Sequence, residues 1–177
     1  MNSLFPLGYY AISGLLNFAT SSLLGLFVIA KNPTGKANRL FSLFCVLVAE
    51  WSFFYFLWLL SSNPVIAEFY LRTCMVGVVF MPSVFTAFVL SLLNKRLNKW
   101  ILIGNYVTSG LFAVLVYTPL FANGVGRHLV FPFWAFPGPA FPLHLIHFGA
   151  NVIYAHYLMF KVIRESSGNL KNQVLFV

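Results

Sequence analysis

Long apolar stretches separated by short polar segments constrain the fold of this chain more than any other feature. A helix needs roughly 20 residues to cross the hydrocarbon core of a bilayer, and every stretch meets that length. Hydrophobic residues make up 60% of the chain and charged residues only 8%, whereas the surface of a water-soluble domain is rich in charge. The sequence therefore predicts an all-α, polytopic bundle of transmembrane helices. The five predicted spans cover residues 4–30, 40–61, 69–93, 100–121 and 141–160.

The two ends of the chain add to this prediction. The first residues, MNSLFPLGYY, lack the basic region and the cleavage site of a signal peptide, so the first span is expected to stay in the mature protein. A sixth span is expected to begin near residue 172, where VLFV follows a polar segment. Because the chain stops there, we expect a fragment or a truncated gene product. Residues 1–177 are interpreted as a single transmembrane domain.

Basic residues alternate between the predicted connections and indicate the orientation. The first, third and last connections each carry three, the second carries none and the fourth carries one. Because cytoplasmic loops are enriched in Lys and Arg, this alternation places the N-terminus outside. It also explains the net charge of +8 without nucleic-acid binding. The basic residues, in chain order, are Lys31, Lys36 and Arg39; Lys95, Arg96 and Lys99; Arg127; and Lys161, Arg164 and Lys171.

Two charged residues fall inside predicted spans, where a charge is costly and marks a functional site by default. Arg72 lies near the outer end of the 69–93 span, and Glu50 lies deeper in the neighbouring 40–61 span. Two partners are open to Arg72. Its long side chain could snorkel outward to Glu68, four residues earlier, and to the outer lipid headgroups, or reach inward to Glu50 on the antiparallel helix. In the same span, Pro82 and Gly77 predict a kink.

The 141–160 span carries a polar stripe. At 100° per residue, His144, His147, Asn151 and Tyr154 share one face of the helix. No carboxylate or thiolate lies near the two histidines in sequence, so we predict no metal site. Two interpretations remain: hydrogen bonding to a neighbouring helix, or a face that recognises a ligand. Together with Glu50 and Arg72, these four residues form the candidate ligand or intramembrane polar site.

The outer connection at 122–140 is rich in prolines and aromatic residues, which preclude a regular helix. It is interpreted either as an aromatic belt at headgroup depth or as a cover over an outward-facing pocket. No catalytic motif occurs in the chain, and its three acidic residues leave little material for paired-carboxylate catalysis. We therefore expect no enzymatic activity from this chain by itself, no catalytic residues and no cofactor.

Several of these segments together resemble the N-terminal seven-transmembrane sensor region of bacterial membrane histidine kinases. The run ANRLFSLFCVLVAEWSFFYFLWLL resembles its second helix, with the central Trp51. The run LRTCMVGVVFMPSVFTAFVL resembles its third, with Arg72, Gly77, Pro82 and Phe88, and GPAFPLHLIHF resembles the Gly138-Pro139 entry to its fifth. The resemblance implies structural roles for Trp51, Gly77, Pro82, Gly138 and Pro139.

The resemblance also implies a function and what this chain lacks. The chain would be the sensor module of a signal-transduction protein in the bacterial cytoplasmic membrane, responding to an extracytoplasmic or membrane cue. The remaining helices and a C-terminal histidine kinase or diguanylate cyclase domain would be missing. The implied partners are the lipid bilayer, a small-molecule or hydrophobic signal, and a second copy of the chain through the missing region. The alternatives are a small multi-pass transporter or carrier subunit, and a structural assembly subunit.

Overall fold

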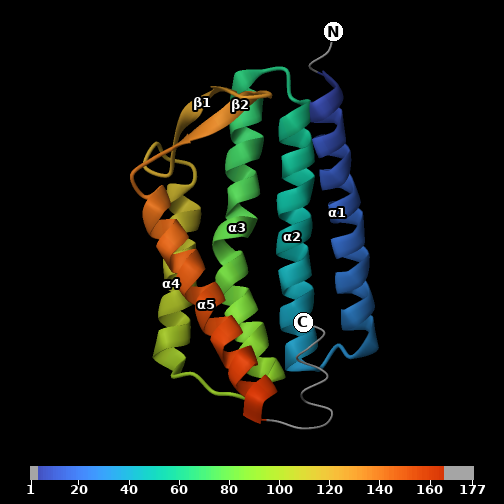
Figure 1. Cartoon of the computed structure of the whole chain (residues 1–177), viewed down its shortest axis with the longest axis vertical. Coiled ribbons are helices and arrows are strands. Elements are labelled where there is room, and N and C mark those ends of the chain that lie inside the picture. Colours follow the sequence, from blue (N-terminus) through green and yellow to red (C-terminus); the bar gives the residue numbers. More distant parts are fainter. Residues whose placement is uncertain (1–3, 166–177) are drawn as a thin grey trace.

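The computed structural model describes residues 4–165, and this part of the chain consists of a helical bundle with one β-hairpin at its end (Figure 1). The predicted start of a sixth span near residue 172 lies outside the described residues. The helices are α1 (Leu4–Lys31), α2 (Lys36–Leu60), α3 (Pro64–Leu92), α4 (Lys99–Leu115) and α5 (Phe141–Glu165), and the strands are β1 (Ala122–His128) and β2 (Phe131–Pro137).

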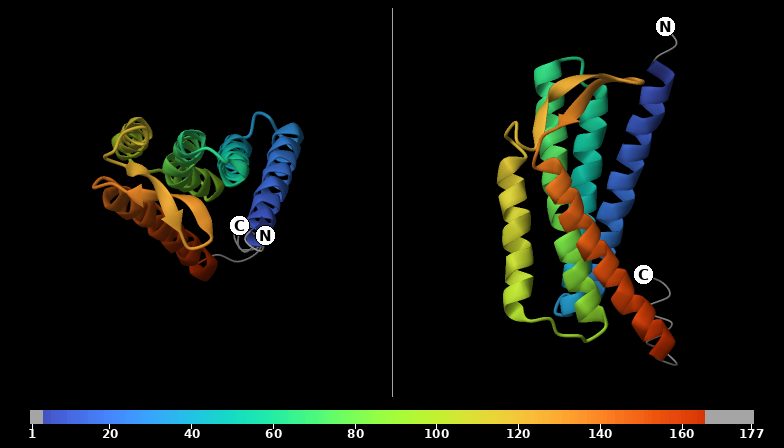
Figure 2. Two further views of the ribbon diagram at one scale, coloured as in Figure 1. Left: turned by 90° about the horizontal axis from the view of Figure 1, so that it is seen from above. Right: turned by 60° about the vertical axis from the view of Figure 1, so that its left-hand side comes forward.

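The central element is α3. It packs against α2, α4, α5 and both strands, whereas α1 packs mainly on α2 (Figures 1 and 2). Small side chains and glycines bring α1 and α2 together: the Asn17 amide donates to Ser52 Oγ over 2.7 Å, and Ser42 Oγ donates to Gly25 O over 2.9 Å. Close packing and hydrogen bonds of this kind associate helices in lipid, where no hydrophobic force acts between them.

Three of the described helices are long and apolar enough to cross a membrane: Gly8–Lys31 of α1, and all of α2 and α3. α4 is apolar but only 17 residues long. The outer faces of α1, α4 and α5 expose large apolar side chains, among them Leu23, Ile103 and Ile146. This distribution suits helices that contact lipid, because a water-exposed surface would need polar side chains there.

α4 ends six residues before the predicted boundary of its span, so that boundary was wrong. The apolar run continues to Phe121, but residues 116–121 form turns, and Pro119 lies among them. Proline cannot donate to a helical ladder and disfavours a helical residue before it. Hydropathy alone did not distinguish this turn from more helix.

The hairpin is the element that the sequence did not predict. β1 and β2 pair antiparallel, with Val125 opposite Ala135 and Gly126 opposite Trp134, and the register shifts on both sides of this central part. Pro132 and Pro137 are compatible with β2 because each strand of a two-stranded sheet has a free edge. The hairpin lies across one end of the bundle, here called the hairpin end (Figure 1).

The opposite end of the bundle holds the connections at 32–35 and 93–98 and the end of α5, and we call it the basic end (Figure 1). Asn98 caps α4 there by accepting from Trp100 N over 2.9 Å, and Asn94 adopts a left-handed conformation with φ of 51° just after α3. Asparagine suits both positions, because its short polar side chain bonds backbone N–H groups and tolerates positive φ. α3 itself continues through Pro82 to Leu92.

Candidate functional site

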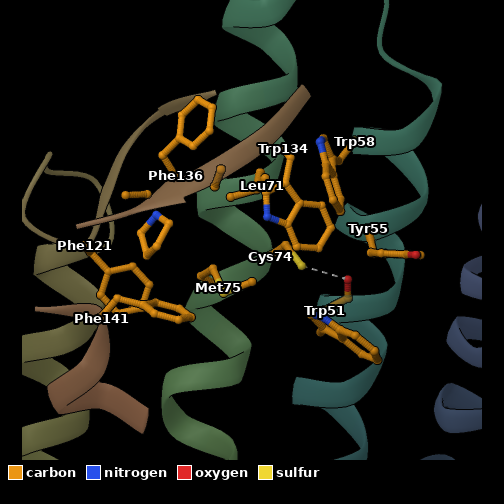
Figure 3. A pocket seen from close by; sticks show the side chains of 13 residues that line it. Trp51, Tyr55, Trp58, Leu71, Cys74, Met75, Phe121, Trp134, Phe136 and Phe141 are labelled. Carbon is orange, nitrogen blue, oxygen red and sulfur yellow. Dashed lines mark hydrogen bonds between the residues drawn. The ribbon is translucent and has the colours of Figure 1, made fainter. Parts of the chain in front are cut away.

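A cavity of about 310 Å³ lies beneath the hairpin, between α2 and α3 (Figure 3). No charged side chain lines it, and more than half of the lining residues are aromatic. A pocket with mostly apolar and aromatic walls is the usual form of a small-molecule site. The lining residues are Trp51, Tyr55, Trp58, Leu71, Cys74, Met75, Phe121, Ala122, Trp134, Ala135, Phe136, Pro137 and Phe141.

Helical spacing places the walls of the cavity. On α2, Trp51, Tyr55 and Trp58 follow one another at intervals of four and three residues, which align side chains on one face of a helix. On α3, Leu71 and Cys74 are three residues apart and face them. Residues 134–137 of β2 close the cavity at the hairpin end (Figure 3).

Trp58 fixes the hairpin to α2. Its indole Nε1 donates to Phe133 O over 2.6 Å, and its ring stacks on Phe131 with centroids 5.9 Å apart and an interplanar angle of 17°. The Trp134 ring lies 5.6 Å from the Trp58 ring. Lower in the cavity, Cys74 Sγ donates to Trp51 O over 3.4 Å, which joins α3 to α2 (Figure 3). The roof and the floor of the cavity are therefore each held by a polar contact.

Arg72 holds the wall of the cavity opposite α2. Its guanidinium donates to Val116 O over 2.5 Å, to Thr118 O over 3.0 Å and to Ala122 O over 2.7 Å. It also pairs with Glu68, where Nη2 and Oε1 are 2.6 Å apart. The carbonyls at the end of a helix lack intrahelical donors, and Arg72 supplies donors at the end of α4. Of the two carboxylates considered as partners of Arg72, Glu68 forms the ion pair.

Glu50 lies against Gly77 instead, and no hydrogen bond reaches its buried Oε2 from any residue that the structure describes. A Cβ added at Gly77 would overlap the Glu50 carboxylate and would lie 2.8 Å from Leu47 O. The absence of a side chain at Gly77 therefore lets α3 approach α2 closely around the Glu50 carboxylate, as small residues permit in membrane proteins.

The polar stripe of α5 connects three helices. His147 Nε2 donates to Asn105 Oδ1 of α4 over 2.6 Å, and Asn105 and Asn151 exchange two amide hydrogen bonds of 2.6 and 3.0 Å. Thr86 of α3 donates to Asn151 Oδ1 over 3.0 Å. These contacts are the interhelical hydrogen bonds that one of the two interpretations predicted.

His144 has a different environment from the rest of the stripe. Its side chain is 1% exposed, and aromatic rings surround it, including Phe112 at 5.4 Å and Phe121 at 5.5 Å between centroids. Nδ1 of His144 and of His147 each lacks a partner in the described part of the chain. No group of three or more His, Cys, Asp or Glu residues suited to a metal ion occurs among residues 4–165.

The predicted polar residues and the cavity largely do not coincide. Trp51, which was assigned a structural role, lines the cavity, whereas Glu50, His147, Asn151 and Tyr154 do not. Arg72 does not line the cavity either, but it donates hydrogen bonds to the 116–122 segment, two residues of which do. Sequence reasoning missed the aromatic lining itself, although the spacing of Trp51, Tyr55 and Trp58 and the aromatic 122–140 connection both carried a signal for it.

Gly138 joins the hairpin to the turn that Arg72 holds. Its N–H donates to Phe121 O over 2.9 Å, and Ala140 N, beyond the exposed Pro139, donates to Leu120 O over 2.8 Å. A Cβ at Gly138 would overlap the carbonyl oxygens of Pro119 and Leu120. Only glycine allows this approach, because it has no Cβ.

The Gly138→Ala variant is expected to lose about 1–3 kcal/mol of unfolding free energy, because the backbone must shift to accept the methyl group. Thermal unfolding of the purified protein in detergent measures the loss. Gly149→Ala is the matched control, since nothing lies within 4 Å of a Cβ there, and it should be neutral or slightly stabilising. Equal melting temperatures for the two variants would contradict the assigned contact.

Comparison with known protein families identifies the family of the chain. No curated protein and no solved structure matches the chain. A family model does match, over residues 14–177, and it describes the N-terminal 7TM region of histidine kinase. The match covers nearly the whole chain and favours a sensor over a transporter. The chain belongs to the family of N-terminal seven-transmembrane regions of histidine kinases, and it is a membrane sensor module.

Proposed function

We propose that this sensor module detects a small, neutral, apolar molecule in the cavity beneath the hairpin. The aromatic cavity of about 310 Å³ is the observation that carries the proposal. Its volume falls at the lower limit of ligand pockets. An engineered cavity of about 150 Å³ binds benzene, so the cavity here has room for about two fused rings. Because no charged residue lines it, an ionic ligand would lose its hydration without a partner.

The hairpin end is proposed to face the outside of the cell. Lys36, Lys95 and Lys99 lie at the basic end, whereas the hairpin carries Arg127 alone. The positive-inside rule then puts the basic end in the cytoplasm and the N-terminus outside. This orientation is consistent with five spans, α4 and α5 included, and with a sixth that begins near residue 172. The proposed location is the bacterial cytoplasmic membrane.

The cavity is proposed to act on the output through α3. Leu71, Cys74 and Met75 of α3 line the cavity, and the same helix continues through Pro82 to the basic end. A ligand shifts an equilibrium only through its different affinity for two arrangements, and repacking about Pro82 would supply the second one. Residues 1–177 would form one sensor domain, followed in the full protein by further helices and a kinase or diguanylate cyclase domain. Dimerisation would occur through that region.

The intramembrane polar residues remain a second proposed recognition site. The observation that favours it is the buried Glu50 Oε2, which has no partner among the described residues. In this proposal the Glu50 carboxyl group forms a hydrogen bond with a polar group of a ligand. For Arg72, His147 and Asn151, the hydrogen bonds described above support structural roles instead.

Naphthalene, which is neutral and has two fused rings, is a suitable probe of the cavity. It is expected to raise the melting temperature of the purified chain in detergent, and a ligand at a hundred times its Kd adds about 2.7 kcal/mol. Ala135→Phe, which fills the cavity, should abolish the shift, while Val114→Phe on the exposed face of α4 should retain it. Naphthalene-2-sulfonate should have no effect. A shift that persists in Ala135→Phe would refute this site.

A further inference from the structure

A second cavity, of about 480 Å³, lies between α4 and α5 with α3 behind it. α4 and α5 diverge toward the basic end (Figures 1 and 2). The cavity between them is an open groove. Ile101, on its wall, is 58% exposed. We call this cavity the α4–α5 groove. Its lining residues are Thr86, Leu97, Ile101, Asn105, Ala150, Asn151 and Tyr154.

The floor of the groove is polar although its surroundings are apolar. Asn105 and Asn151 bond each other there, and among the described residues Asn105 Nδ2 makes one hydrogen bond, to Asn151 Oδ1. A side-chain amide has two N–H donors, so one donor of Asn105 is left over. The Tyr154 hydroxyl, one turn along α5, makes no hydrogen bond within residues 4–165. In hydrocarbon an unused donor is costly, so the groove favours an occupant that carries acceptors.

Three basic residues flank the groove residue Leu97 in the sequence. Lys95, Arg96 and Lys99 are all exposed and lie on either side of Leu97, which lines the groove. Asn105 lies seven residues beyond the cap of α4 at Asn98, which corresponds to about 10 Å along the helix. In a membrane, these cations would lie near the surface at the basic end, and the Asn105 amide would lie about 10 Å deeper along α4. A phospholipid has the complementary order, with its phosphate at the surface, then its ester carbonyls, then its acyl chains.

We propose that the α4–α5 groove binds one anionic phospholipid from the leaflet at the basic end. The phosphate lies among Lys95, Arg96 and Lys99, the ester carbonyls accept from Asn105 and Tyr154, and an acyl chain covers the apolar wall at Ile101. Basic pockets between transmembrane helices bind anionic headgroups by the same chemistry. The site is separate from the cavity beneath the hairpin and does not depend on which side that cavity faces.

Lipid retention by the full chain in detergent, measured by native mass spectrometry, tests the proposal with phosphatidylglycerol against phosphatidylcholine. The wild type should retain phosphatidylglycerol in clear preference. Replacing Lys95, Arg96 and Lys99 with glutamine should weaken its retention about 100-fold, at about fivefold for each cation. The same change at Lys31, Lys36 and Arg39, in the other basic connection, is the matched control and should have less than a fivefold effect.

A second variant separates the groove from surface charge. Ala150 lines the groove and is exposed, so Ala150→Phe fills the groove without disturbing the core, and it should weaken retention at least tenfold with every cation intact. Unchanged retention in Ala150→Phe would mean attraction to surface charge only, and the groove proposal would be wrong. Equal retention of the two lipids would overturn it as well, as would full displacement of the lipid by millimolar inorganic phosphate.

Discussion

The Arg72→Ala variant is expected to lose about 3–5 kcal/mol of unfolding free energy, because several backbone carbonyls lose their donor and each unmade hydrogen bond costs about 1–3 kcal/mol. The Arg72 side chain is only 11% exposed and donates five hydrogen bonds, two of them to Glu68 and three to carbonyls of residues 116–122. Its removal leaves these acceptors unpaired in a region of low polarity, where an unmade hydrogen bond is most costly. Thermal unfolding in detergent measures the loss.

Two further variants make this prediction specific. Arg72→Lys keeps the charge but not the planar guanidinium fork, so it should recover only about half of the loss. Arg127→Ala removes an exposed arginine from the hairpin and should leave the melting temperature nearly unchanged. If Arg72→Ala melts at the same temperature as Arg127→Ala, the hydrogen bonds assigned to Arg72 contribute nothing and the interpretation fails.

Gly77→Leu is the second change with a large expected effect, and it should prevent α2 and α3 from packing together. Even the Cβ of alanine would overlap the Glu50 carboxylate and lie 2.8 Å from Leu47 O. Gly77→Ala is therefore expected to lose about 1–3 kcal/mol through overpacking, and the larger leucine more. The yield of monodisperse protein and its melting temperature in detergent report the effect.

A double variant identifies the contact responsible. Removing the carboxylate with Glu50→Ala should recover part of the Gly77→Ala loss, because the Leu47 carbonyl still opposes the methyl group. Gly104→Ala, on the open side of α4, should be neutral or stabilising, since nothing lies within 4 Å of its Cβ. Strict additivity of Gly77→Ala and Glu50→Ala would show that the two residues do not touch.

The helices could be predicted because lipid imposes their length and composition. The charges at Arg39 and Lys95 limit the apolar runs, and those runs correspond to α2 and α3, which begin four and five residues before the predicted starts. The hairpin could not be predicted in the same way. Its pairing joins Val125 to Ala135 in a stretch with two prolines. Exposure alternates along β2, but its residues, FPFWAFP, are almost all apolar, so the hydropathy of the sequence does not alternate there.

The candidate site was predicted only in part, for a related reason. The partners of Arg72 across the bundle are backbone carbonyls of residues 116–122. Because every residue has a carbonyl, the side-chain types at these positions could not indicate the contacts. Charge directed attention to Glu50 and Arg72, while the cavity is built from uncharged rings brought together by α2 and β2. The stripe of His147 and Asn151 was predictable because helical periodicity alone places both residues on one face.

The contacts of Arg72 also order the events of synthesis. Its three carbonyl partners are 44, 46 and 50 residues further along the chain. At 5–20 residues per second, a ribosome takes about 2–10 s to make that segment. The first 20 residues of this segment complete α3, which ends at Leu92, and until residues 116–122 follow, Arg72 has only Glu68, one turn away on the same helix. Glu68 is thus the one partner available to Arg72 while the chain is being synthesised. The contacts of Arg72 that close the hairpin end of the bundle form only after α4 has been made.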